Sequence, residues 1–100
     1  MNALQRRIKN VIERVGDTFT VGGTARKGVF TVLPASAARD YLPQGEIDAA
    51  PRPLRLVYTA FDDPSAMGNT VSWSSITLTV RKVVEVRYQD SLIAKLLVLY

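Results

Sequence analysis

The side chains best suited to chemistry in this sequence are two adjacent aspartates, Asp62 and Asp63, and three serines, Ser72, Ser74 and Ser75. A carboxylate pair can act as general acid and base or bind a metal ion, but both roles need further partners. The sequence has no histidine and no cysteine, so the commonest general base, the commonest metal ligand and any thiolate are missing. Without a base, nothing activates the serine hydroxyls. A proline directly follows the aspartates, which is typical of a turn.

Other signatures of catalysis are missing as well. The sequence has no phosphate-binding loop, zinc-ligand spacing, nucleophile elbow or dinucleotide fingerprint. We therefore predict a protein that is not an enzyme and uses no cofactor, metal ion or small-molecule substrate. No apolar run approaches the roughly 20 residues that span a bilayer, so no membrane partner is expected. One hundred residues, of which 47% are hydrophobic, correspond to a single globular domain, 1–100.

Positive charge is concentrated in the first third of the chain. Residues 1–30 carry six basic and two acidic side chains, a balance of +4, whereas residues 31–100 carry seven of each. Four of these basic residues lie in the first predicted helix: Arg6, Arg7, Lys9 and Arg14. A basic surface of this kind suits DNA or an acidic protein partner. The alternative interpretation is an ordinary solvated helix face.

Nucleic-acid binding by a small β domain would need exposed aromatic side chains on a basic sheet face. The aromatic candidates in the predicted strands are Tyr58, Trp73 and Tyr88. They alternate with aliphatic residues, which favours packing in the core. The charges of the second half of the chain also nearly cancel, whereas a nucleic-acid groove needs an excess of positive charge.

The elements that must position these residues begin with a helix over residues 3–15. Its apolar residues recur at the helical period and form one stripe: Leu4, Ile8, Val11, Ile12 and Val15. Asn2 is a suitable N-cap, and Gly16 is expected to end the helix in a left-handed conformation. A helix this short is marginal alone, so its stripe must dock on the rest of the molecule.

Strands are predicted for most of the remaining chain. A strand opens at Asp17, and Gly22-Gly23 has the chemistry of a two-residue hairpin turn. The returning strand covers 24–33, where Gly28 indicates a bulge or a close approach of the backbone. Alternation predicts later strands at 54–60, around 71–73, 76–80, 84–88 and 92–100. Between them, residues 35–53 form an unusually long connection, with one helical turn expected at 36–42 and no periodicity beyond it.

The last predicted strand is apolar on both faces. Five of its residues lie on one side, Leu92, Ala94, Leu96, Val98 and Tyr100. Ile93, Leu97 and Leu99 lie on the other. A small barrel buries only one face, and an uncovered second face would aggregate. We therefore expect the stripe of the N-terminal helix, or else a neighbouring subunit, to cover the second face.

The order of these features resembles one protein family. A short helix, a strand opening on Gly16-Asp17-Thr18, a Gly22-Gly23 hairpin and a Gly28-Val29-Phe30 strand resemble the small head–tail connector proteins of tailed bacteriophages. These comprise head-closure (stopper) proteins and head–tail joining proteins. In the second half, the turn Gly68-Asn69-Thr70-Val71 leads into barrel strands that carry Ile76, Leu78 and Val80, then Leu96, Val98 and Tyr100. Asn69 stands where the family usually has an aspartate.

The resemblance implies an α+β, mainly β fold: a small antiparallel β-barrel (17–100) with one N-terminal amphipathic helix (3–15) packed on it and a long loop (35–53) between early strands. It also implies a structural role without turnover. Copies would form a ring in the virion neck, between portal/adaptor and tail, after assembly in the host cytoplasm. The ring would seal packaged DNA and provide the attachment surface for the tail-top protein.

The resemblance further suggests which residues make contacts. In the family, the long loop can project toward the central channel, and the matching positions are Tyr41, Leu42, Gln44, Glu46 and Ile47. The alternative is that this loop packs over one end of the barrel. The four basic residues of the helix would contact DNA or an acidic adaptor surface.

Three other functions stay open on the sequence. Within the same class, the chain would be a tail-completion protein at the top of the tail. From other classes, it would be a small nucleic-acid-binding β-barrel or a peptide-binding adaptor module. Salt-dependent DNA affinity favours the second function, and peptide binding at a sheet edge favours the third.

Overall fold

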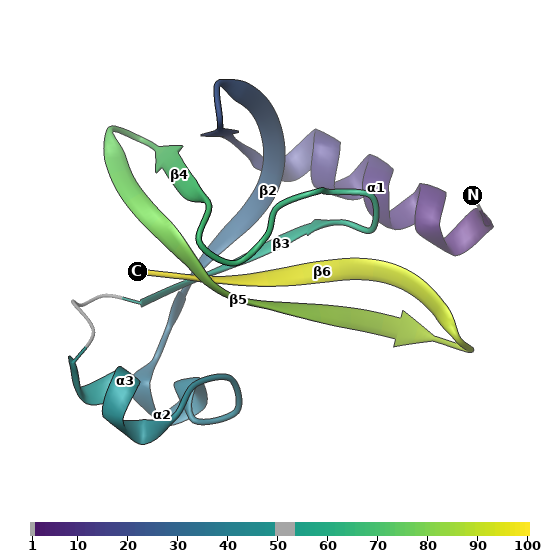
Figure 1. The fold of residues 1–100 in the computed structure, drawn as a ribbon. Helices are drawn as coiled ribbons and strands as arrows, with labels where there is room; N and C mark the ends of the chain where they lie inside the picture. Colours follow the sequence, from purple (N-terminus) through teal and green to yellow (C-terminus); the bar gives the residue numbers. More distant parts are fainter. Residues whose placement is uncertain (1, 50–53) are drawn as a thin grey trace.

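The computed structural model describes residues 2–49 and 54–100. It confirms an α+β, mainly β fold in which one antiparallel sheet of six strands carries an N-terminal helix packed on it (Figure 1). Among the described residues, no helix is long and apolar enough to cross a membrane.

The first helix, α1 (Ala3–Val15), has the predicted bounds and the predicted cap. The Asn2 side chain accepts a hydrogen bond from the Gln5 N–H at 2.8 Å, and the Gln5 side chain accepts one from the Asn2 N–H at 2.9 Å. This reciprocal capping box satisfies two of the free donors at the helix start. The prediction for Gly16 was wrong, because its φ of −78° and ψ of 162° are extended. Glycine is needed there for space: a Cβ would lie 2.5 Å from the Ile12 carbonyl oxygen.

Six strands follow: β1 (Asp17–Val21), β2 (Thr24–Leu33), β3 (Leu54–Ala60), β4 (Thr70–Trp73), β5 (Ile76–Tyr88) and β6 (Ser91–Leu99). They pair in the order β1-β2-β3-β6-β5-β4, and β4 pairs with β1, so the strands form a ring. Gly22 and Gly23, at φ of 58° and 84°, make the predicted hairpin turn between β1 and β2. The two strands predicted at 76–80 and 84–88 are one, β5. A register shift between Val80 and Lys82 breaks the alternation, and this makes the sequence look like two strands.

Strand β2 changes partner at Gly28. Its first half pairs with β1 as far as Asp17–Gly28, and its second half pairs with β3 from Val29–Tyr58 onward. A Cβ on Gly28 would lie 2.6 Å from Val57 Cγ1 and 3.0 Å from Phe19 Cε1. The close approach predicted at this glycine is therefore confirmed.

The core has two parts, and β6 contributes one face to each. The first cluster combines Leu97 and Leu99 with residues of the other strands: Phe19, Val21, Val57, Val71, Leu78 and Val80. The second cluster contains Leu96 and Val98 from the opposite face of β6. The prediction that β6 is buried on both faces is confirmed.

The cover of that second face comes mainly from the connection between β2 and β3. This connection contains two short helices, α2 (Ala35–Ala38) and α3 (Gln44–Ala49), although no helix was predicted beyond residue 42. Ala38, Leu42 and Ile47 belong to the second cluster together with Leu96 and Val98. The cover that we assigned to α1 is thus supplied at these two positions by α2, α3 and the turn between them.

Helix α1 packs against β2, β3 and β6, well separated from α2 and α3 (Figure 1). Ile12 is its buried residue, and the Gln5 side chain donates a 2.7 Å hydrogen bond to the Leu92 carbonyl oxygen. Val11 and Val15, at the edge of the predicted stripe, are exposed. The stripe therefore docks through Ile12 and the half-buried Leu4 and Ile8, and not through the two valines.

Candidate functional site

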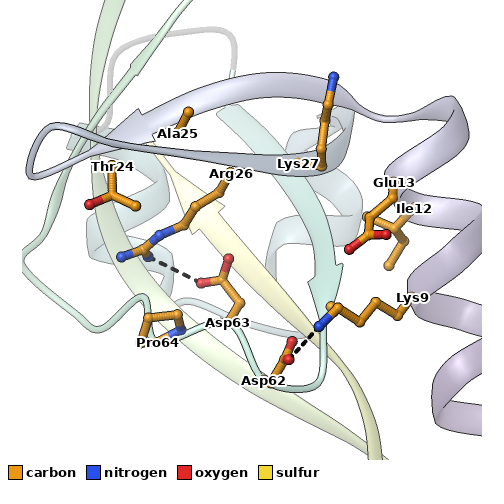
Figure 2. Close-up of a pocket in the computed structure, with 11 residues that line it drawn as sticks. Lys9, Ile12, Glu13, Thr24, Ala25, Arg26, Lys27, Asp62, Asp63 and Pro64 are labelled. Atoms are coloured by element: carbon orange, nitrogen blue, oxygen red, sulfur yellow. Dashed lines mark hydrogen bonds and ion pairs between the residues drawn. The ribbon is translucent and has the colours of Figure 1, made fainter.

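A cleft lies where β2 separates from β3. It has a volume of about 380 Å³ and is bounded by α1, residues 24–27 of β2 and residues 60–64, which end β3 and begin the next loop (Figure 2). Its charged lining is balanced, with Lys9, Arg26 and Lys27 against Glu13, Asp62 and Asp63.

One wall of the cleft is held by a buried polar network around Asp63. The Asp63 carboxylate accepts a 2.8 Å hydrogen bond from the Ser65 N–H, which forms a local turn. Arg26 Nη1 lies 3.4 Å from the same carboxylate oxygen and donates a 2.7 Å hydrogen bond to Ser65 Oγ. Lys95 Nζ donates to the Asp63 carbonyl oxygen at 2.8 Å. Asp63 is 7% exposed, so its charge depends on these donors.

The other wall is closed by an exposed ion pair. Lys9 Nζ lies 2.6 Å from Asp62 Oδ2 and joins α1 to the loop after β3 (Figure 2). The hydrogen bond to Asp62, aided by the charges of Asp62 and Glu13, raises the pKa of Lys9 against a smaller opposing effect of burial. Because both side chains are accessible, water screens this pair.

The geometry of the two aspartates supports a structural role. Asp62 and Asp63 are engaged by different cations, Lys9 and Arg26, on different sides of the cleft (Figure 2). General acid and base catalysis by this pair would require both carboxylates to face the same reacting group. The described residues contain no cluster of three or more potential metal ligands. Ser74 and Ser75, at φ of 49° and 66°, form the tight turn between β4 and β5.

The five predicted contact residues of the long connection separate into two groups. Leu42 and Ile47 are 5% and 1% exposed and pack in the second cluster, so their side chains are occupied within the chain. Tyr41 is half-buried, whereas Gln44 and Glu46 are exposed. Of the five, Tyr41, Gln44 and Glu46 are therefore the ones whose side chains are accessible to another molecule.

The four predicted basic contact residues of α1 also differ in their surroundings. Lys9 is held by Asp62, as described above. Arg6, Arg7 and Arg14 are exposed, and no hydrogen bond or ion pair of their side chains joins them to other described residues. Arg7 and Arg14 are seven positions apart and so lie on the same side of the helix. The structure therefore leaves three arginines for an external partner.

The aromatic residues are not arranged as predicted. Tyr58 and Tyr88 are 41% and 56% exposed, so the prediction that they pack in the core was wrong. Tyr58 lies opposite Leu96 of the second cluster but is not among the residues packed against that cluster, and Tyr88 is the last residue of β5. Trp73 is half-buried and stacks on Phe30, with ring centroids 4.2 Å apart and an angle of 5° between the planes. Arg55 Cζ lies 5.4 Å from the Trp73 ring centroid, which completes a cation–π contact.

Two clusters were not predicted from the sequence: the network of Arg26, Asp63 and Ser65, and the stack of Phe30, Trp73 and Arg55. Both join residues far apart in the chain, and no local pattern marks such pairs. No family model, curated protein or solved structure matches this chain.

Proposed function

We propose that this protein is a structural connector of a tailed-phage neck, a head-closure or head–tail joining protein that forms a ring between portal/adaptor and tail. The observation that carries the proposal is the arrangement of elements. A short helix packs on a closed ring of six antiparallel strands, and a long connection joins the second and third strands. This arrangement is compatible with the small barrel and single helix that the resemblance implies, and the Gly22-Gly23 turn and the Gly28 close approach lie between and within its first two strands.

The long connection has the properties of a contact element. Its apolar residues Leu42 and Ile47 anchor it to the sheet, so that Tyr41, Gln44 and Glu46 are presented on a fixed base. An anchored element loses less conformational entropy on binding than a free loop. These three side chains are the proposed contacts with a neighbouring subunit or with the channel.

The exposed arginines of α1 supply the second proposed contact. Arg6, Arg7 and Arg14 lie on an element that is separate from the long connection (Figure 1). Their charge suits packaged DNA or an acidic adaptor surface. With two contact elements on different parts of the molecule, each subunit can meet its ring neighbours and the adaptor at the same time.

The mechanism is steric. Ring contacts are heterologous, because different surfaces of successive subunits meet. A portal–adaptor complex that presents a symmetric template adds avidity to contacts that are weak between free chains. The assembled ring then blocks the channel and offers the tail a flat docking surface.

Removing the protein from the phage tests this function. We expect a null mutant to produce packaged heads that lose DNA and carry no tails, as seen by negative-stain microscopy and DNase sensitivity. The triple variant Tyr41→Ala, Gln44→Ala, Glu46→Ala should fail to complement, whereas a control with Gln89→Ala in the distant β5–β6 turn should complement fully. Normal, tailed, infectious particles in the null mutant would refute the function. DNA-filled heads that stay closed but lack tails would favour a tail-completion role.

The stacked aromatic pair favours a second candidate function, nucleic-acid binding. Trp73, Phe30 and Arg55 form a stacked surface with a cation, and such surfaces bind the bases of single strands. Binding of single-stranded DNA that quenches Trp73 fluorescence and weakens steeply with salt would support this function. Unchanged fluorescence in low salt would exclude it.

A further inference from the structure

The outer edge of strand β5 is unpaired over half of its length. Strand β4 pairs with Ile76–Thr79, and the loop residues Gly68 and Asn69 bond to Val80. From Lys82 to Tyr88 this edge has no strand or loop bonded to it among the described residues. Figure 1 shows the β5–β6 hairpin extending beyond the ring, with β6 joined to β3 on its far side. An exposed edge of this length is a template for another strand.

The directions of the free backbone groups follow from the hairpin turn. Gln89 and Asp90 form a two-residue turn at φ of 50° and 65°, so the flanking pair of Tyr88 and Ser91 is hydrogen-bonded. Alternation along β5 then directs the N–H and C=O groups of Val83, Glu85 and Arg87 away from β6. The register shift at Arg81 lies outside this stretch. A second shift falls between Val86, which pairs with Ala94, and Arg87, which pairs with Leu92. Its extra residue, Ile93, belongs to β6, so the alternation along β5 itself continues.

The side chains of this edge are complementary to themselves. Glu85 and Arg87 share one face of β5 and form an ion pair of 3.1 Å within the chain, with both side chains about half exposed. If a second copy aligns antiparallel with Val86 opposite Val86, each Glu85 stands opposite Arg87 of the second copy. On the other face, Val84 stands opposite the exposed Tyr88. All of these are favourable cross-strand pairs.

Neighbouring registers are less favourable. The alignment can be shifted so that it is centred one residue earlier or one residue later. Centring it on residue 85 places Glu85 opposite Glu85, and centring it on residue 87 places Arg87 opposite Arg87. Like charges directly opposite each other are destabilising. In the register centred on Val86, the outward N–H and C=O groups of Glu85 bond to those of Arg87 of the second copy, and the reverse pair forms as well. The two pairs together give about four hydrogen bonds.

We propose that the β5 edge is a self-association surface, on which two copies of this chain pair antiparallel through residues 83–88 and join their sheets. The contact is isologous and small, so a weak, reversible dimer is expected. It concerns the free chain and does not depend on the neck proposal, because copies in a ring share one orientation and cannot meet by this twofold contact.

Charge exchange at two positions tests the pairing. Sedimentation velocity of the full chain from about 1 μM to about 1 mM should show a monomer–dimer equilibrium. Glu85→Arg alone, or Arg87→Glu alone, turns both cross-strand ion pairs into repulsions and should raise the dimer Kd by roughly tenfold or more. The double variant Glu85→Arg, Arg87→Glu restores opposite charges in the same register and should regain the dimer. An equimolar mixture of the two single variants should form a heterodimer that neither variant forms with itself.

A second readout locates the contact on the backbone. Amide hydrogen exchange at Glu85 and Arg87 should slow as concentration rises, whereas exchange at Val86, which bonds to β6, should not change. Circular dichroism of each variant checks that the fold is intact, and Lys27→Glu on the exposed part of β2 is the matched charge control. A monomer at every concentration would overturn the proposal. So would a dimer whose Kd the single variants leave unchanged, or assembly into species larger than a dimer through this edge.

Discussion

Gly28→Ala tests whether the approach of β2 to β3 requires a glycine. The added Cβ would lie 2.6 Å from Val57 Cγ1, 3.0 Å from Phe19 Cε1 and 3.3 Å from the Tyr58 carbonyl oxygen. Val57 and Phe19 are 0% and 1% exposed, so neither side chain can move into solvent. Overpacking of this kind costs about 1–3 kcal/mol. For a domain of this size, the melting temperature should fall by roughly 5 to 20 °C.

The assay is urea unfolding followed by circular dichroism, with two comparisons. Gly45→Ala is the matched control, because a Cβ there meets nothing within 4 Å and the residue lies in α3. Alanine at this helical site should stabilise the protein by up to about 1 kcal/mol. Combining Gly28→Ala with Val57→Ala removes the closest contact, so the double variant should be more stable than the sum of the single effects predicts, by about 1 kcal/mol.

Two results would refute this reasoning about Gly28. The first is a Gly28→Ala protein as stable as the parent, within about 0.5 kcal/mol. The second is strict additivity with Val57→Ala, which would mean that Val57 Cγ1 does not limit the space.

The remaining predictions concern the cap of α1 and the two ion pairs of the cleft. Asn2→Ala removes the capping box and should lower the free energy of unfolding by about 1 kcal/mol in urea titrations, whereas Asn2→Asp should retain most of it. Arg26→Met leaves the buried Asp63 carboxylate with the Ser65 N–H as its remaining donor and should lower the free energy of unfolding by about 1–3 kcal/mol. Adding Asp63→Asn should recover part of that loss. If it recovers none, the proposed network is contradicted. Because the pKa of Lys9 is raised, its contribution to stability is complete below the unfolded value of 10.5 and is lost as the pH rises through the folded value. Between about pH 9 and about pH 12, the melting temperature of Asp62→Asn should therefore fall less than that of the parent protein. Equal falls in melting temperature would contradict the stabilising role of the Lys9–Asp62 pair.

Local signals predicted much of the fold. The bounds of α1 followed from its period and its cap, and the Gly22-Gly23 hairpin followed from the positive φ that both positions require. Strand β2 was predicted from Thr24 to Leu33 because a turn and a proline mark its two ends. In each case the deciding interaction lies within a few residues of the chain.

Elements that depend on distant contacts were missed or misassigned. Helix α3 has only six residues, and it is the burial of Ile47 against the sheet that stabilises it, since a helix of this length is not stable alone. The lack of space for a side chain at Gly16 comes in part from the Gly28 carbonyl oxygen, which is twelve positions away in the chain and 2.8 Å from where a Cβ would lie. The continuity of β5 was hidden because the register shift at Arg81 reverses which residues face inward.

The candidate site was the least predictable part of the molecule. The sequence indicated that Asp62 and Asp63 form a turn, and the hydrogen bond from Ser65 confirms it. Nothing in the sequence indicated that Arg26 would reach this turn, because strand pairing alone brings the two segments together. Alternation with aliphatic residues likewise did not reveal that Tyr58 is exposed.

The most direct test of the proposed neck function is cryo-electron microscopy of intact virions that carry this chain, focused on the neck. We expect a ring of copies between the adaptor and the tail, with Tyr41, Gln44 and Glu46 facing a neighbouring subunit or the channel and with α1 toward DNA or the adaptor. A neck in which no density accommodates the helix and the six-stranded ring would contradict the proposed function.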